Sequence, residues 1–162
     1  METHDLKPYI AEHPFFEGLA PEYIELIAGC AKNVVFEAGS YVFKQATTAE
    51  WFYVLRDGHA VVEVPSGRGS SLRVSTLGAG DILGWSWLIP PYVYQFDARA
   101  VEKTRAVALD GECLRGKCET DSDLGYELMK RFSTVMTTRL QEARLQLIDM
   151  YSTSPDGEAT ND

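Results

Sequence analysis

Residues 80–100 contain most of the groups that could bind a ligand. Gly84 is followed by two indole side chains, Trp85 and Trp87, with Ser86 between them. Glycine allows a close approach of the backbone to a ligand, and an indole ring can stack on a base while its N–H donates a hydrogen bond. We therefore expect a binding turn, in which Ser86 and backbone amides near Gly84 are donors and the indoles are stacking walls.

Polar side chains beyond the indoles could complete the site. Tyr94 and Arg99 are the candidate polar partners of a ligand. Arg99 lies two residues after Asp97 on an expected strand, so both side chains share one face and could pair with each other. Both interpretations of Arg99 stay open. The candidate ligand-binding residues are Ile82, Leu83, Gly84, Trp85, Ser86, Trp87, Leu88, Tyr94, Phe96 and Arg99.

Patterns for other chemistry are weak. A metal-dependent jelly-roll enzyme needs about three histidines and a carboxylate inside the roll, and His59 is the only histidine among the expected strands. The glycines of residues 78–84 do not have the spacing of a dinucleotide fingerprint. We expect no catalytic residues, no metal site and no enzyme.

Length and charge restrict the class of protein. The 162 residues suit one domain, and the net charge of −9 argues against a nucleic-acid partner, which needs a basic face. No apolar run approaches the roughly 18 residues of a membrane span. Cys30, Cys113 and Cys118 are odd in number and follow no secretory signal. We therefore expect three ordinary thiols in a reduced, cytoplasmic protein.

The elements that must position the candidate site are short strands between helices. Residues 6–30 read as helical, with Pro21 suited to a first helical turn. Asp57-Gly58 between two apolar runs predicts a β-hairpin. Short strands with frequent turns predict a mainly β fold with flanking helices, a double-stranded β-helix or jelly roll over residues 32–110. The expected strands cover residues 34–36, 41–43, 51–55, 59–64, 72–77, 98–100 and 104–109.

A long helix is expected over residues 121–151, with Asp121, Ser122 or Asp123 as its cap. One apolar stripe, at Leu124, Leu128, Phe132 and Val135, could lie on the roll. A second stripe has the alternating spacing of a coiled-coil seam and predicts a parallel homodimer, unless both stripes pack on their own domain. The seam residues are Met136, Leu140, Ala143, Leu147 and Met150. Residues 152–162 are polar and acidic, and we expect a disordered tail.

The order of these patterns resembles a known family. In the cyclic nucleotide-binding domain, residues 15–19 would correspond to the entry helix, residues 36–45 to the first turn and strand, and residues 53–62 to the following hairpin. Residues 77–84 resemble the segment that leads into the phosphate-binding cassette of that domain, which is called the cassette below and covers residues 80–100 here. The resemblance covers about residues 6–150, within an expected domain of residues 1–151. Within this family the chain most resembles the sensor half of the catabolite-activator/FNR regulators. This resemblance implies a jelly roll with a long dimerisation helix.

The cassette departs from the family pattern. In the family a glutamate after the glycine binds the ribose hydroxyl, and a later arginine neutralises the cyclic phosphate. Gly84 matches, but Trp85 stands in the place of the glutamate and Tyr94 or Gln95 in that of the arginine, while Arg99 matches a later strand position. Each lost charged partner costs several kcal/mol. Tight binding of cyclic AMP in the usual manner is therefore not expected.

The resemblance and its departures lead to two functional hypotheses. The first is a stand-alone regulatory module that senses a small molecule, either a cyclic nucleotide or another small ring-containing ligand, and requires no cofactor. Too few residues follow the long helix to form a recognition helix, so DNA binding is not expected. The second is a ligand-free dimerisation scaffold in which the tryptophans fill a degenerate pocket and the dimer docks on a protein partner.

Overall fold

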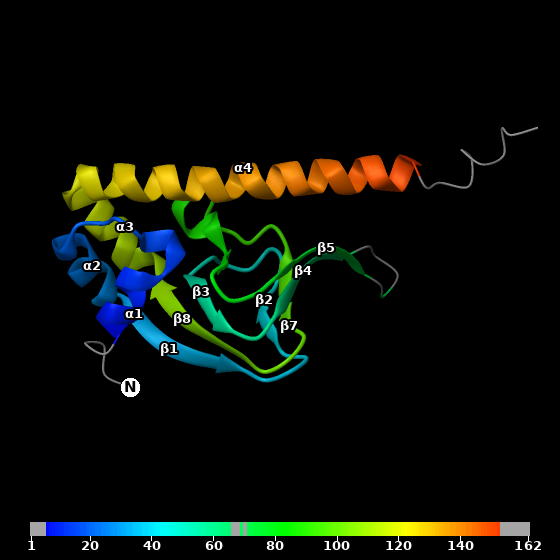
Figure 1. Ribbon diagram of the computed structural model, residues 1–162, viewed down its shortest axis with the longest axis horizontal. Helices are drawn as coiled ribbons and strands as arrows, with labels where there is room; N and C mark the ends of the chain where they lie inside the picture. The colour runs from blue at the N-terminus through cyan, green and yellow to red at the C-terminus, as the bar shows by residue number, and fades with distance from the viewer. Residues whose placement is uncertain (1–5, 66–68, 70, 153–162) are drawn as a thin grey trace, which may run out of the picture. The chain divides into compact units, whose positions relative to one another are not determined.

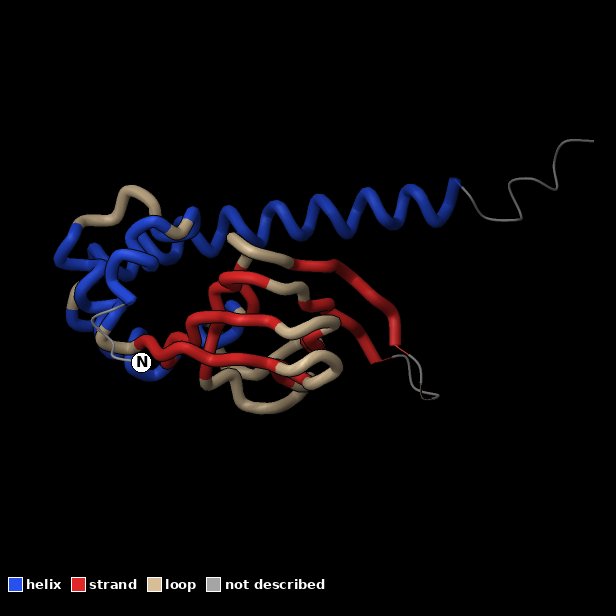
Figure 2. Tube along the Cα trace, turned by 60° about the horizontal axis from the view of Figure 1, so that its bottom comes forward, coloured by secondary structure: helices blue, strands red, loops and turns tan. Residues whose placement is uncertain are grey.

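The computed structural model describes residues 6–65, 69 and 71–152. The chain divides after Leu128 into two compact units, which are described separately. The first unit contains a β-roll, and α1, α2 and α3 gather at one end of its strands (Figure 2). None of the helices in these ranges combines the length and the apolar character that a membrane span requires.

The N-terminal part is helical, as predicted, but in three separate pieces (Figure 1). These are α1 (Leu6–Glu12), the 3₁₀ turn η2 (Pro14–Phe16) and α2 (Pro21–Ala28). Proline begins both η2 and α2, where its missing N–H costs no hydrogen bond. His13 caps η2, because its Nδ1 accepts a hydrogen bond from the N–H of Phe15 at 3.2 Å.

Two four-stranded antiparallel sheets form the roll and confirm the predicted jelly roll. Apolar side chains of both sheets, among them Leu55, Val62, Leu83 and Ala98, pack together between the sheets. One sheet has the order β1 (Ala31–Phe36), β8 (Thr104–Asp110), β3 (Trp51–Asp57) and β6 (Ile82–Leu83). The other has the order β2 (Tyr41–Phe43), β7 (Asp97–Ala100), β4 (Ala60–Pro65) and β5 (Ser71–Leu77).

The predicted hairpin at Asp57-Gly58 is wrong. The strands before and after it, β3 and β4, belong to different sheets, and β3 pairs with β8 and β6 instead. Gly58 has a φ of 87°, and a Cβ there would lie 2.5 Å from the carbonyl oxygen of Lys103. The turn therefore does need glycine, but it carries the chain from one sheet to the other.

The expectation of three free thiols is also wrong. Cys30 and Cys113 form a disulfide with their Cα atoms 5.8 Å apart, and Cys118 is the free cysteine of the described residues. Antiparallel pairing of Ala31 with Leu109 brings the two cysteines together across 83 residues of sequence. The thiol count no longer supports a reduced compartment, since disulfides are rare in the cytosol, and a cytoplasmic location stays a prediction.

A helix that the sequence patterns did not predict, α3 (Gly111–Thr120), follows β8 directly. Asp110 caps it by accepting a hydrogen bond from the N–H of Cys113 at 3.2 Å. The helix contains two glycines and buries one large apolar residue, Leu114, so its apolar periodicity is weak. It connects the roll to the last helix.

The long helix α4 (Ser122–Ser152) confirms the predicted helix and begins in the first unit. The Oδ1 of Asp121 accepts hydrogen bonds from the N–H groups of Asp123 and Leu124, as expected of a cap. In the second unit, three of the five seam residues are largely exposed: Leu140 is 63% exposed, Leu147 52% and Met150 59%. Residues 153–162 of the expected tail lie outside the described residues.

Candidate ligand-binding site

A cavity of about 310 Å³ opens beside the cassette. It lies where β2, the β2–β3 connection, β3 and the cassette meet, and four of its lining residues are aromatic. Of the candidate residues only Tyr94 lines it. The lining residues are Val42, Phe43, Thr47, Thr48, Glu50, Trp51, Tyr53 and Tyr94. This volume is at the lower end of the range for small-molecule sites, which begins near 300 Å³.

Gly84 lies against two of the rings that line this cavity. It has a φ of 88° and precedes the 3₁₀ turn η3 (Trp85–Leu88). A Cβ at this position would lie 3.2 Å from a ring carbon of Tyr94 and 3.3 Å from one of Phe43. Both the left-handed backbone and the close approach of the two rings therefore favour glycine here.

Tyr94 is held in place by several contacts. It is 4% exposed, and its ring stacks on that of Phe43 with centroids 3.8 Å apart and planes at 3°. Its hydroxyl donates to the carbonyl oxygen of Trp51 at 2.5 Å. Its backbone N–H donates to the carbonyl of Thr47 at 3.0 Å. Tyr94, one of the two residues that could stand in place of the family's arginine, is thus a firmly anchored phenol.

The two phenols of the cavity stay neutral at ordinary pH. Burial raises the pKa of Tyr53 to about 12. Burial also raises the pKa of Tyr94, and the nearby phenol of Tyr53 and carboxylate of Glu50 raise it further, against a smaller lowering by the hydrogen bond to Trp51. Both hydroxyls can therefore act as hydrogen-bonding groups without adding charge.

Trp87 belongs to the core. It is 0% exposed and stacks on Phe52 with centroids 5.1 Å apart. Its carbonyl oxygen accepts a hydrogen bond from Arg115 at 2.5 Å. A Cβ on Gly111 would lie 2.8 Å from the Cβ of Trp87, so α3 and η3 are in close contact. The structure thus places Trp87 against α3 and not on the wall of the 310 Å³ cavity.

The other apolar candidates are divided between core and surface. Leu83 lies within the core of the roll, and Phe96 packs against that core. Ile82 is buried in β6. Trp85, Ser86 and Leu88 are partly exposed on η3.

Arg99 forms an ion pair, but not with Asp97 as the sequence suggested. Its Nη2 and Nε donate to the two carboxylate oxygens of Glu63 at 3.0 and 3.2 Å. Asp97 instead accepts a hydrogen bond from the backbone N–H of Gln45 at 2.8 Å. Because Ala98 packs into the core, Arg99 points to the opposite face of β7. Through its hydrogen bonds and its charge, the Arg99 guanidinium lowers the pKa of the Glu63 carboxyl.

The charge of the cavity differs from that of a phosphate site. Glu50 contributes a carboxylate, and the described lining residues include no lysine, arginine or histidine. Sequence reasoning missed the lining residues from β2, β3 and the loop between them. The aromatic alternation in residues 41–43 and 51–53 was the available signal, but it does not reveal which strands meet the cassette.

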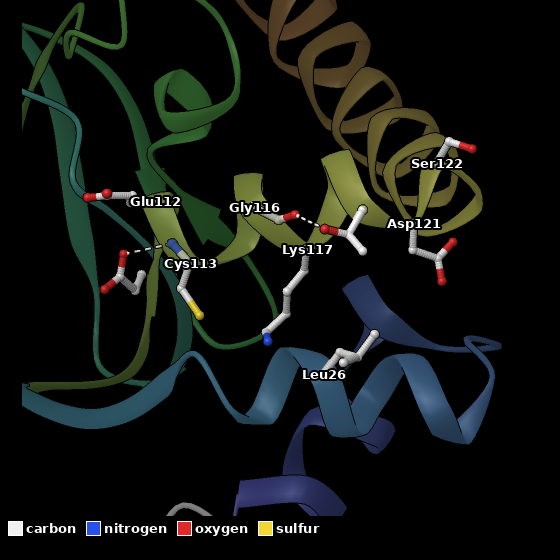
Figure 3. A pocket seen from close by; sticks show the side chains of 9 residues that line it. Leu26, Glu112, Cys113, Gly116, Lys117, Asp121 and Ser122 are labelled. Carbon is white, nitrogen blue, oxygen red and sulfur yellow. Dashed lines mark hydrogen bonds between the residues drawn. The ribbon is translucent and has the colours of Figure 1, made fainter.

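A larger cavity of about 1010 Å³ lies elsewhere, between α2, α3 and the start of α4 (Figure 3). Its lining includes Cys113 of the disulfide and the side chains of Lys117 and Leu26, which both point into the space between α3 and α2. It contains none of the candidate residues. Within the described ranges, no three His, Cys, Asp or Glu side chains gather as ligands for a metal ion.

Two curated proteins are similar in sequence. The cAMP-dependent protein kinase regulatory subunit of Schizosaccharomyces pombe is 32% identical over 101 residues, which are 62% of this chain and 24% of that protein. The cyclic AMP receptor protein of Thermus thermophilus is 25% identical over 134 residues, which are 83% of this chain and 60% of the relative. The chain therefore spans less than two thirds of the length of either relative.

Solved structures share the fold. A cyclic nucleotide-binding protein of Geobacter metallireducens has a TM-score of 0.74 and 29% identity, with 86% of this chain and 98% of that chain covered. The catabolite activator protein of Thermus thermophilus has a TM-score of 0.67 and 25% identity, with 86% and 63% covered. The sequence model of the cyclic nucleotide-binding domain matches residues 33–121. Because this match covers more than half of the 162 residues, the chain belongs to the cyclic nucleotide-binding domain family.

Proposed function

We propose that the chain is a small-molecule-sensing regulatory module in which the ligand enters the cavity beside the cassette. The observation that carries this proposal is the 310 Å³ space that Tyr94 and seven other residues line. Gly84 lies against the rings of Tyr94 and Phe43, so a ligand in this space would also meet the start of η3. Trp85 and Ser86 follow Gly84 directly in the sequence and are the further residues that we propose to contact the ligand.

The route from cavity to signal runs through η3 and α3. Arg115 of α3 binds the carbonyl of Trp87 in η3, and Gly111 of α3 lies against the same residue. The last residue before α4, Asp121, follows α3 directly. A ligand that binds one position of η3 more tightly than another would favour the corresponding position of α3 and of the start of α4. The difference between the two affinities sets how far this equilibrium is shifted.

The proposed output surface is the seam on α4, which would form a parallel homodimer. Its residues recur with alternating spacings of four and three, and Leu140 and Leu147 are more than half exposed. An exposed apolar seam of this period is typical of a coiled coil. Replacing both Leu140 and Leu147 by Asp should give a folded monomer in analytical ultracentrifugation. A parent protein that is already monomeric at micromolar concentration would refute the dimer.

Ligand binding can be tested with a panel of cyclic mono- and dinucleotides and other small ring compounds. Trp51 lines the cavity and two further tryptophans lie on η3, so binding should change the intrinsic fluorescence and raise the melting temperature. The control is the same titration at the Leu140→Asp, Leu147→Asp variant, which keeps the cavity. If no compound of the panel changes the intrinsic fluorescence or the melting temperature, the sensing function is contradicted.

The burial of Trp87 favours a second candidate function. Trp87 and Phe52 are both buried and stack on each other, and the hydroxyl of Tyr94 is already hydrogen-bonded to the carbonyl oxygen of Trp51. In a ligand-free scaffold these groups would replace the ligand, and the dimer would dock on a partner protein. A silent ligand panel together with a stable dimer is the result that this alternative predicts.

A further inference from the structure

We propose that the cavity beside the cassette accepts a small organic cation with a quaternary-ammonium-like head group, rather than an anionic cyclic phosphate. The inference rests on the proposed sensing function and names the chemical class of its ligand. It follows from two properties of the lining, its aromatic walls and the sign of its charge.

The walls are suited to a cation because several aromatic rings line the space. Phe43, Trp51, Tyr53 and Tyr94 are half of the eight lining residues. The face of an aromatic ring carries negative potential, and sites built from several rings bind alkylated ammonium groups. The stack of Phe43 on Tyr94, fixed by the hydroxyl bond to Trp51, holds two of these rings in place without a ligand.

The charge of the lining has the same preference. Burial is the largest cause of the raised pKa values of both cavity tyrosines, and the nearby Glu50 carboxylate makes a smaller contribution in the same direction. Both phenols are therefore neutral, and Glu50 supplies the one formal charge among the described lining residues. An anion would lie beside this carboxylate, and none of the described lining residues would offer it a positive charge. A cation would meet an opposite charge.

The protein's own cations already use one of these rings. The Nζ of Lys32, from β1, lies 4.3 Å from the centroid of the Trp51 ring. One face of the Trp51 ring is therefore already covered by the Lys32 ammonium group in the free protein. The head group of a ligand would contact the other aromatic rings of the lining, which are Phe43, Tyr53 and Tyr94.

The test compares three probes by tryptophan fluorescence and thermal shift on the full chain. They are choline, its neutral carbon analogue 3,3-dimethylbutan-1-ol, and cyclic AMP. We expect choline to bind roughly tenfold or more tightly than the alcohol of the same shape. Glu50→Gln should weaken choline roughly fivefold and leave the alcohol unchanged. Glu50 is exposed, so the variant should fold. Glu37→Gln, which removes an exposed carboxylate outside the cavity lining, is the matched control and should bind as the parent does.

The outcomes separate this inference from the proposed function. Equal affinity for choline and the alcohol, or an unchanged affinity in Glu50→Gln, would overturn recognition by charge. Binding of cyclic AMP without binding of choline would overturn the cation and leave the sensing function intact. Silence of all three probes and of the wider ring-compound panel would overturn both.

Discussion

The hydroxyl of Tyr94 offers the sharpest perturbation of the cassette. Tyr94→Phe removes one oxygen atom and keeps the ring that stacks on Phe43. In the parent that hydroxyl donates to the carbonyl oxygen of Trp51 at 2.5 Å and accepts from its N–H at 3.3 Å. Tyr94 is 4% exposed, so water cannot easily replace the lost partner. The substitution therefore leaves backbone groups at the start of β3 without a hydrogen bond.

The cost can be worked from these contacts. A buried group left without its partner costs about 1–3 kcal/mol, and the longer bond adds little because its geometry is weak. We expect a loss of about 2 kcal/mol in the free energy of unfolding. For a chain of this length that corresponds to a fall of about 4–8 °C in Tm.

Urea unfolding followed by circular dichroism measures this loss directly. Tyr41→Phe is the matched control, because Tyr41 is 45% exposed and its ring keeps its contact with Lys44. We expect the control to lie within about 0.5 kcal/mol of the parent. A Tyr94→Phe protein as stable as the control would refute the view that this phenol anchors the cassette to β3.

Three further predictions concern groups around the roll. Arg99→Met should destabilise the fold by about 2–3 kcal/mol, because the Glu63 side chain is only 8% exposed and loses its ion-pair partner. A double-mutant cycle with Glu63→Gln should show coupling between the two substitutions, and additive losses of stability would contradict a stabilising ion pair. Burial lowers the pKa of His13, so its contribution to the free energy of unfolding is fully present above about pH 6.5 and is lost as the pH decreases below that value. His13→Asn, which keeps a capping acceptor, should make the free energy of unfolding depend less on pH in urea titrations at several pH values. An unchanged pH dependence would exclude His13 as its source. Cys30→Ser with Cys113→Ser opens a loop of 83 residues and should cost about 4 kcal/mol, whereas Cys118→Ser should cost less than about 0.5 kcal/mol; equal effects on thermal unfolding would contradict the disulfide.

Much of the fold could be predicted because its signals are local. The strands follow short apolar and aromatic runs, and Asp121 caps α4 as its position before an apolar stripe predicts. Strand pairing depends on distant residues and was less accessible. The turn at Gly58 has the composition of a hairpin, yet β3 finds its partners in β8 and β6. The disulfide depends on the same long-range pairing of β1 with β8.

The candidate site shows the same division. The cassette could be located from its glycine, its indoles and its resemblance to a family, and Tyr94 was found in this way. Its neighbours in the cavity, such as Phe43, Glu50 and Trp51, come from β2, β3 and the segment between them. Arg99 has a suitable side chain for a ligand, but strand alternation turns it to the outer face, where Glu63 lies. Residue type alone does not specify that direction.

An amide chemical-shift map tests the central claim most directly. The ¹⁵N-labelled protein would be titrated with the cyclic nucleotides, choline and the other ring compounds. If the space beside the cassette is the sensing site, the largest shifts for a binding compound should centre on Gly84, Trp51 and Tyr94 and extend through η3 to Gly111. Shifts centred on another surface, or an unchanged spectrum with every compound, would contradict it.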